Sequence, residues 1–231
     1  MYLTWNEKTV TDFSDTNIER MYATGYVFTR KGKGVIQQTR SLRVDLHKFE
    51  LSSENRRVLA RTSKLGIRNY ELWDGSFKYD WQIGKMAKDF YNKFGVKTFS
   101  ANKIKELLTD KSKSNFNTLL EYRGQTSHEE DWPRGLGYAI CYQSKNILHY
   151  AYPFYSLISL GYLIPKDAKN MGLGMMTRAV VWAKEKGKKY VYLGSASRPS
   201  DTYKLQFNSI EWYDGTTWSN DITKLKNVLK V

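Results

Sequence analysis

The sequence predicts an α+β fold in which a mixed, mainly antiparallel sheet carries helices on both faces. Two observations lead to this prediction. The chain has 231 residues, of which 41% are hydrophobic, and this suits a single well-packed domain over residues 1–231. Its second half reads as an antiparallel meander, followed by a strand, a glycine loop, a helix, another strand and a closing hairpin.

The N-terminal half, residues 1–115, contains capped amphipathic segments that predict helices and alternating apolar segments that predict strands. Gly25 is placed to end the first helix, and Ser52 and Ser100 are placed as N-caps of later ones. The expected helices cover residues 15–24, a segment that starts at 52–53, 82–94 and 100–109, and the expected strands cover 26–28 and 35–49.

The C-terminal half, residues 116–231, gives a clearer pattern. A proline at 165 ends one apolar strand, Gly187 closes a helix, and an Asp-Gly pair at 214–215 predicts a hairpin turn. The expected strands are 117–123, 136–143, 146–153, 157–164 and 189–194, and the expected helices are 174–186 and 220–230.

Charge is the strongest global feature of the composition. The chain has 37 Lys and Arg residues against 23 Asp and Glu residues, which gives a formal net charge of +14. An excess of this size favours a polyanionic partner such as nucleic acid. Aromatic residues reach 15%, and most of them are expected in the core and the sheet.

Cys141 is the only cysteine, so a disulfide within the chain and a thiolate cluster for zinc or iron–sulfur are excluded. The apolar run around it predicts a buried thiol. Residues 1–8 lack the apolar region of a signal peptide, and no apolar run has the length of a membrane span. We therefore expect a cytoplasmic protein with no membrane, metal or iron–sulfur partner.

Residues 165–174 form a glycine-containing loop between a predicted strand and a predicted helix. Glycines let a backbone approach a ligand closely, and the amides of a helix N-terminus favour phosphate or pyrophosphate. The missing Gly-Lys-Ser/Thr excludes a P-loop, and the missing third glycine excludes a dinucleotide fingerprint. The candidate anion-binding residues are Lys166, Lys169, Asn170, Gly172 and Gly174.

This order of elements over residues 135–195 resembles the GNAT acyltransferases, in which a Gly-x-Gly loop after the fourth strand holds the pyrophosphate of acyl-CoA. Three further stretches are similar to the arginyl- and leucyl-tRNA–protein transferases. They are residues 42–59 with the pair Arg56 and Arg57, residues 18–26, and residues 203–207 followed by Glu211 and Trp218. Members of that family carry a cysteine cluster before the first of these stretches, whereas residues 35–40 contain none here.

The resemblance implies an enzyme that moves an amino acid, of the arginine or leucine class, from aminoacyl-tRNA to the N-terminal amine of a protein. The amine attacks the ester directly, without a covalent enzyme intermediate. Aminoacyl-tRNA is a co-substrate, so no separate cofactor is expected. The partners implied are aminoacyl-tRNA and a protein or peptide N-terminus.

The matched stretches also suggest site residues. Arg56 and Arg57 are candidates for binding tRNA, since adjacent guanidinium groups suit phosphates. Tyr203, Lys204 and Glu211 are the catalytic candidates: a hydroxyl for the oxyanion or ribose, a positive charge, and a carboxylate as general base or amine anchor. Each also has a plain structural reading, as a salt-bridged surface pair or a strand residue.

Two other functions remain open. The absent cysteine cluster leaves room for a GNAT N-acyltransferase that uses acyl-CoA and is indifferent to RNA. A non-catalytic RNA-binding protein on a GNAT scaffold would bind RNA with a steep salt dependence and no turnover.

Overall fold

The computed structural model describes residues 3–95, 99–124, 135–157 and 170–229. Within them, eight strands form one sheet in the order β11-β10-β4-β9-β8-β7-β6-β5. All pairs in this sheet are antiparallel except β8 with β9. The strands are β4 Ser41–Asp45, β5 Leu65–Glu71, β6 Thr118–Gly124, β7 Gly137–Gln143, β8 Ile147–Tyr155, β9 Tyr190–Ser195, β10 Ile210–Tyr213 and β11 Trp218–Ser219.

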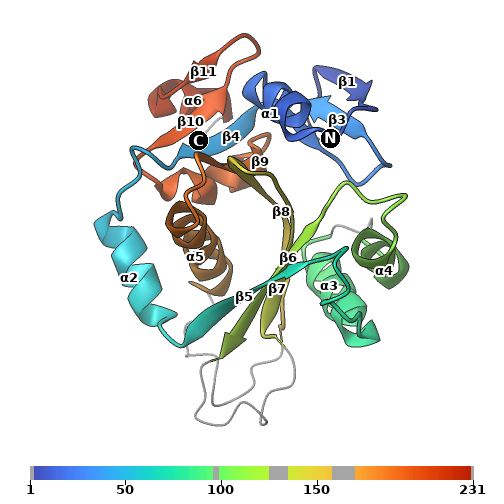
Figure 1. Ribbon diagram of the computed structural model, residues 1–231. Coiled ribbons are helices and arrows are strands. Elements are labelled where there is room, and N and C mark those ends of the chain that lie inside the picture. The colour runs from blue at the N-terminus through green and yellow to red at the C-terminus, as the bar shows by residue number, and fades with distance from the viewer. Residues whose placement is uncertain (1–2, 96–98, 125–134, 158–169, 230–231) are drawn as a thin grey trace.

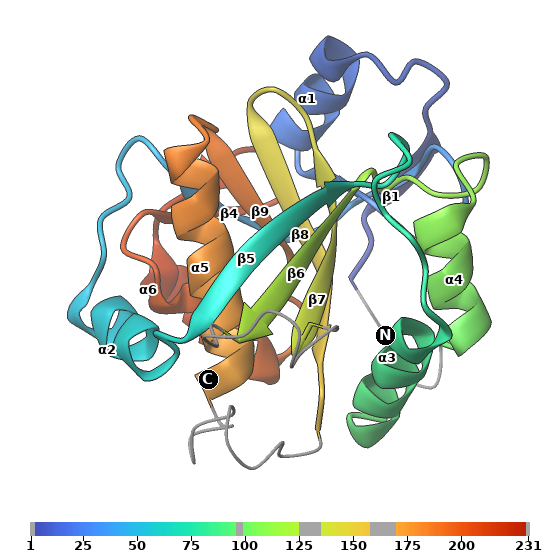
Figure 2. The same ribbon diagram turned by 60° about the horizontal axis from the view of Figure 1, so that its bottom comes forward.

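Helices cover both faces of this sheet, and each face has its own hydrophobic core. Figure 2 shows α5 lying along one face, with α2 outside it, while α3 and α4 cover the other face. The first face carries α2 Ser53–Arg61, α5 Met171–Glu185 and α6 Ile222–Leu229; the second carries α1 Asp15–Ala23, α3 Trp81–Lys93 and α4 Ala101–Thr109. The α+β fold predicted from the sequence, with a mixed, mainly antiparallel sheet and helices on both faces, is therefore confirmed.

A small second sheet lies beside α1 (Figure 1) and has the order β1-β3-β2. Its strands are β1 Asn6–Thr9, β2 Tyr26–Phe28 and β3 Val35–Gln38. The single strand predicted over residues 35–49 is thus wrong, because β3 and β4 belong to different sheets. The polar residues between them explain the change: Thr39 donates its hydroxyl to the carbonyl of Leu3, and the carbonyl of Arg40 accepts from the amide of Ala196.

The α5 helix makes the crossover that parallel β8 and β9 require. Met171 and Met175 are four positions apart and both buried, so they lie on the same packed face of the helix. Their burial stabilises the first turn as helix. The helix consequently begins at Met171 and not at the predicted residue 174, and both glycines of the motif lie in its first turns. Its end at Gly187, with φ of 71°, matches the prediction.

Most other predicted elements are confirmed to within a few residues. Ser52 and Ser100 accept hydrogen bonds from the amides of Asn55 and Lys103, and the turn at Gly215 joins β10 to β11. Strands β1 and β5 and the 3₁₀ helix Pro199–Gln206 have no counterpart in the sequence prediction. The predicted strand 157–164 falls, except for its first residue, outside the described residues. Among the described residues, no helix is long and apolar enough to cross a membrane.

Candidate functional site

The parallel strands β8 and β9 pair over a short stretch only. Ile147, Leu148 and His149 pair with Tyr190, Val191 and Tyr192. Beyond this point β8 continues to Tyr155 beside β7, and β9 continues to Ser195 beside β4. We call this parting of the strands, between residues 150–155 and 193–195, the β8–β9 divergence. Within the described residues, the two facing strand edges share no backbone hydrogen bonds here. A ligand can enter a sheet at such a gap.

The N-terminus of α5 lies at the far end of the divergence. A Cβ built on Gly172 would lie 3.4 Å from the ring of Tyr155, the last residue of β8. Asn170 caps the helix without a side-chain hydrogen bond, and the first turn has no acidic residue. The first amides of any helix lack intrahelical acceptors and stand at the positive end of its dipole. This end of α5 therefore offers donors to an anion.

Gly174 serves a different purpose from Gly172. A Cβ at this position would lie 2.5 Å from Cγ2 and 2.8 Å from Oγ1 of Thr62, the residue that ends α2. Gly174 is buried by this contact and allows α2 and α5 to pack closely. The two glycines of the predicted loop are thus separated, one beside the strand end and one beneath α2.

Positive groups gather at the carboxyl end of β9. Lys204 donates to the carbonyl of Ser195 at 2.7 Å, and Arg40 donates through Nη1 to the carbonyl of Ala196 at 3.3 Å. The buried Nε–H of Arg40 has no hydrogen-bond acceptor among the described residues. The Arg40 guanidinium thus places a second positive charge next to the end of β9.

Hydroxyl groups line the same strand end. The Ser195 hydroxyl lies 2.8 Å from that of Thr39 and 2.5 Å from that of Ser197, and the amide of Leu3 donates to Ser197 Oγ at 3.4 Å. The cluster ties the N-terminal segment to the end of β9 and adds neutral hydrogen-bonding groups next to Arg40.

Asp201 organises the turn that carries Lys204. It is buried, accepts from the amides of Ser197 and Arg198 at 2.9 and 3.0 Å, and lies 3.6 Å from Lys204 Nζ. Burial opposes ionisation of Asp201, but Lys204 and the two amides outweigh it, and the pKa of the carboxyl falls below its ordinary value. Burial lowers the pKa of Lys204, although Asp201 opposes this. Lys204 is therefore held in place and releases its proton more readily than an exposed lysine does.

Tyr203 and Tyr150 continue the site toward the first core. Tyr203 is 52% exposed, whereas Tyr150 on β8 is buried and lies close enough to Tyr203 to interact electrostatically with it. The Tyr150 hydroxyl also neighbours that of Tyr122, which donates to the carbonyl of Met175 at 2.9 Å. These phenols lead from the surface at Tyr203 inward to α5.

His149 belongs to the second core and not to the site. Its Nδ1 lies 2.9 Å from the hydroxyl of Tyr22, and its ring packs edge-on against the same tyrosine. Burial, with a smaller contribution from the charge of Lys204, lowers its pKa to about 3. The imidazole is therefore neutral at physiological pH.

Glu211 is separated from the other two catalytic candidates. Its neighbours on β10, Ile210 and Trp212, face the first core, so Glu211 faces the opposite side of the sheet. There Glu211 accepts a hydrogen bond from Arg43 Nε at 2.7 Å. The Arg43 guanidinium also lies about 4 Å from the ring centres of Tyr190 and Trp218. The structure brings Lys204 and Tyr203 together but places Glu211 in a partly buried ion pair.

Arg56 and Arg57 lie on the outer surface of α2. Arg56 donates to the carbonyl of Leu51 at 2.5 Å, and Arg57 forms an ion pair with Glu54. The last turn of α2 reaches the start of α5, and Arg178 of α5 donates to the carbonyls of Leu59 and Thr62. The arginine pair is thus on a helix that borders the site without entering it. Lys166 and Lys169 lie outside the described residues.

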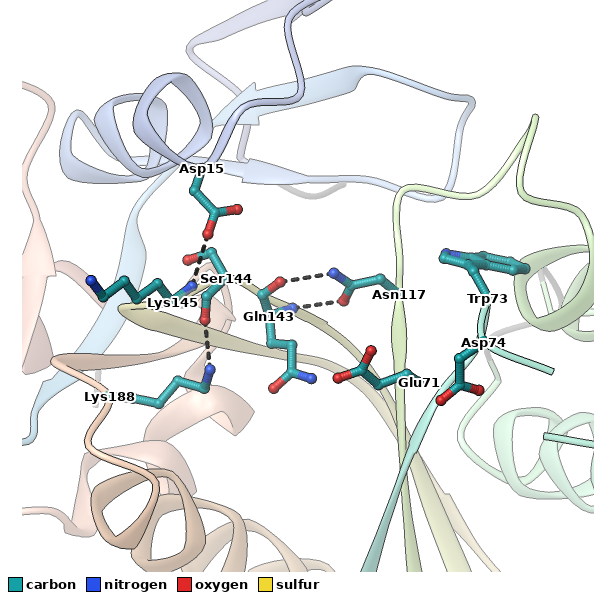
Figure 3. Close-up of a pocket in the computed structure, with 9 residues that line it drawn as sticks. All are labelled: Asp15, Glu71, Trp73, Asp74, Asn117, Gln143, Ser144, Lys145 and Lys188. Carbon is teal, nitrogen blue, oxygen red and sulfur yellow. Dashed lines mark hydrogen bonds between the residues drawn. The ribbon is translucent and has the colours of Figure 1, made fainter. Parts of the chain in front are cut away.

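A separate polar pocket of about 510 Å³ lies at the opposite end of α5 (Figure 3). Many of its polar groups bind one another: Asp15 accepts from the amide of Lys145 at 2.9 Å, and Lys188 donates to the carbonyl of Ser144 at 2.5 Å. It is lined by Asp15, Glu71, Trp73, Asp74, Asn117, Gln143, Ser144, Lys145 and Lys188. This pocket is remote from the β8–β9 divergence and is not part of the candidate site.

Sequence reasoning did not identify Arg40, Tyr150 or Asp201 as site residues. Asp201 precedes Lys204 by three positions, a spacing that signals a local ion pair. Arg40 gave no such signal, because its role depends on the meeting of β4 and β9 across more than 150 residues of sequence.

No family model and no curated protein matches this sequence. Similar solved structures include L-PGS from Bacillus licheniformis, with 13% identity over 79% of this chain and 52% of that chain and a TM-score of 0.46. FemX matches with 12% identity over 94% of this chain and 71% of that one, with a TM-score of 0.46. A third match is a GCN5-related glucosamine N-acetyltransferase region of a fungal multi-domain GH3 β-N-acetylglucosaminidase. Its identity is 10% over 88% of this chain and 22% of that chain, and the TM-score is 0.45. The chain spans about half of the L-PGS chain, and with TM-scores below 0.5 these likenesses carry no conclusion about this chain.

Proposed function

We propose that this protein transfers an amino acid, of the arginine or leucine class, from aminoacyl-tRNA to the N-terminal amine of a protein. The observation that carries the proposal is the β8–β9 divergence, which has the amides of α5 at one end and Lys204 and Arg40 beside the carboxyl end of β9. The resemblance of residues 42–59 and 203–207 to tRNA–protein transferases and the net charge of +14 support the same reading.

The charged 3′ end of the tRNA is proposed to lie in the divergence. Its phosphates would accept from the first amides of α5 at Asn170 and Gly172, and the Arg40 guanidinium would add a positive charge beside the end of β9. Arg56 and Arg57, on the neighbouring helix, are proposed to contact the tRNA backbone further from the ester, with Lys166 and Lys169 adding charge.

The chemistry needs no covalent enzyme intermediate. The neutral α-amine attacks the ester carbonyl, the new C–N bond forms, and the C–O bond to the terminal ribose breaks. The ribose oxygen must take up one proton and the attacking nitrogen must lose one. Lys204, with a pKa lowered by burial, is proposed to donate its proton to the departing oxygen and then, as a neutral amine, to take up the proton that the attacking nitrogen releases. Tyr203 is proposed to donate to the oxyanion. Glu211 has no part in these steps, since Arg43 holds it on the other face of the sheet.

The proposal is tested by transfer of radiolabelled arginine or leucine from charged tRNA to peptides that differ only in their N-terminal residue. Label on the peptide that disappears after RNase treatment or N-terminal acetylation supports it. Absence of transfer with every charged tRNA and every peptide would reject it.

A second candidate is an N-acyltransferase that uses acyl-CoA, and the position of the α5 N-terminus supports it as well. A helix N-terminus beside parting parallel strands suits a pyrophosphate as well as it suits RNA phosphates. Micromolar binding of CoA by calorimetry, with acyl transfer that RNase does not affect, would select this candidate. RNA binding without either transfer would leave the RNA-binding protein on a GNAT scaffold.

A further inference from the structure

The helices α3 and α4 form an insertion between two strands that need no such connection. β5 and β6 pair along their full lengths, from Leu65 with Gly124 to Glu71 with Thr118, so a short hairpin would suffice to join them. Residues 72–117 instead build α3 and α4, which bury Ile83, Ala87, Ile104 and Leu107 against the second core.

The insertion is rich in lysine. Residues 76–114 contain nine lysines and no arginine, against four carboxylates. Several of the carboxylates are used locally, as in the ion pairs Lys85–Asp89 and Lys103–Glu106. This segment therefore contributes a substantial share of the net positive charge and presents it on one side of the sheet.

One face of α3 combines this charge with an exposed indole. Trp81 is 65% exposed and packs against no other aromatic ring among the described residues. At 3.6 residues per turn, Lys85, Lys88 and Asn92 follow it along the same side of the helix, and all are exposed. We define Trp81, Lys85, Lys88 and Asn92 as the α3 ridge.

The α3 ridge leads to the candidate site. At the C-terminal end of α3, Tyr91 donates to the carbonyl of Pro153 at 3.0 Å, and the ring of Phe90 lies 4.7 Å from that of Tyr155. Tyr155 in turn touches Gly172 at the start of α5. The C-terminal end of α3 thus packs beside the end of β8 that borders the divergence, on the side of the sheet opposite α2 (Figure 1).

Charge and shape distinguish the possible occupants of this ridge. A bilayer would require a continuous apolar stripe, but the exposed apolar residues Trp81 and Phe94 are separated by the length of the helix and lie on different sides of it. Lysines spaced along a helix with one planar aromatic group fit the phosphates and an unpaired or terminal base of RNA.

We propose that the α3 ridge binds the acceptor stem of the tRNA whose 3′ end enters the β8–β9 divergence. This inference rests on the proposed function for the identity of the RNA. Lys88 neutralises one phosphate, and Lys85 binds another by exchanging its exposed ion pair with Asp89 for the phosphate. Trp81 stacks on a base, and the stem lies along α3 while α2 borders the 3′ end from the other side.

The test compares the Trp81→Ala/Lys85→Gln/Lys88→Gln variant with the Lys186→Gln/Lys226→Gln variant, which removes two exposed lysines elsewhere. Binding of full-length charged tRNA is measured by fluorescence anisotropy from 50 to 300 mM salt. The ridge variant should bind about tenfold more weakly, and the slope of log Kd against log salt should fall by about 1 to 2, one for Lys88 and up to one for Lys85, which is paired with Asp89 in the free protein. The control variant should match the wild type, and circular dichroism should show both folded.

A small probe separates this inference from the proposed function. Puromycin, which mimics only the aminoacylated 3′-terminal adenosine, should bind or inhibit equally in the wild type and the ridge variant. If tRNA affinity and slope are unchanged in the ridge variant while label transfer persists, the ridge proposal is wrong and the proposed function stands. If the wild type transfers no label but the ridge substitutions still weaken tRNA binding, the proposed chemistry alone is overturned. A ridge variant that loses binding to anionic vesicles but not to tRNA would overturn the RNA assignment.

Discussion

The pairing of Lys204 with Asp201 is the most informative arrangement of single residues. Asp201 is buried and fixed by two backbone amides, and it positions a lysine that also binds the last carbonyl of β9. A charged group held in this way loses little conformational freedom when a substrate arrives. We therefore propose that Lys204 acts as a fixed proton donor beside the β8–β9 divergence.

Replacing Lys204 should impair turnover more than binding. Lys204→Gln should lower kcat for label transfer by about 100-fold or more, because the departing ribose oxygen loses its proton donor. KM for charged tRNA should change little, since most of the tRNA contacts lie elsewhere. Lys186→Gln, at the far end of α5, provides the matched control. A Lys204→Gln enzyme with near-normal kcat would remove Lys204 from the mechanism.

His149 predicts a pH dependence of stability that is independent of catalysis. Its pKa is about 3 in the folded state and about 6.5 in the unfolded state, so the unfolded chain binds one more proton between these values. Stability should fall as the pH drops below 6.5, by up to about 1.4 kcal/mol per pH unit from this residue. Urea unfolding from pH 7.5 to 4.5 should show a smaller slope for His149→Asn. Equal slopes would contradict the buried neutral imidazole.

At the scale of elements, the junction of α2 and α5 places the start of α5 at the divergence. Gly174 allows the close approach of Thr62, whose hydroxyl is fixed by the carbonyl of Val58 at 2.9 Å. Arg178 adds hydrogen bonds to the last carbonyls of α2. The position of the anion-binding end of α5 thus depends on packing against a helix more than 100 residues earlier in sequence.

Two glycine substitutions in the same helix should have opposite effects. Gly174→Ala should reduce the free energy of unfolding by about 1–3 kcal/mol, because the new Cβ overlaps Thr62. Gly172→Ala meets only the ring of Tyr155 at 3.4 Å and gains helix propensity, so stability should rise by up to about 1 kcal/mol. Urea denaturation of both variants checks this. A destabilised Gly172→Ala together with a neutral Gly174→Ala would show that the packing of α5 is misassigned.

Local sequence signals predicted much of the fold for a physical reason. Caps, terminating glycines and amphipathic periods act within a few residues, and they located α1, α3, α4 and the β10–β11 turn. The separation of β3 from β4, the earlier start of α5 and the role of Arg40 depend on contacts between distant segments. Of the predicted site residues, Lys204 and Tyr203 lie together. Glu211 instead pairs with Arg43, which is 168 positions earlier in the sequence and was not indicated by any local pattern.

At the scale of the whole molecule, positive charge surrounds the candidate site on two sides. α2 with Arg56 and Arg57 borders the start of α5 on one face of the sheet, and α3 with Lys85 and Lys88 approaches it on the other (Figure 2). The central claim is that the β8–β9 divergence between them receives the aminoacylated 3′ end of a tRNA.

Site-specific photo-crosslinking tests this claim most directly. The photoreactive residue p-benzoylphenylalanine is placed at Tyr203, beside the divergence, or at the exposed Phe13, which stacks on Phe28 next to Tyr142 at the other end of the sheet. The RNA is a tRNA that carries an amide-linked, non-hydrolysable amino acid. We predict that Tyr203→p-benzoylphenylalanine crosslinks to the 3′-terminal nucleotides and that Phe13→p-benzoylphenylalanine does not. Crosslinks from position 203 only to distant parts of the tRNA, or equal 3′-end labelling from position 13, would contradict it.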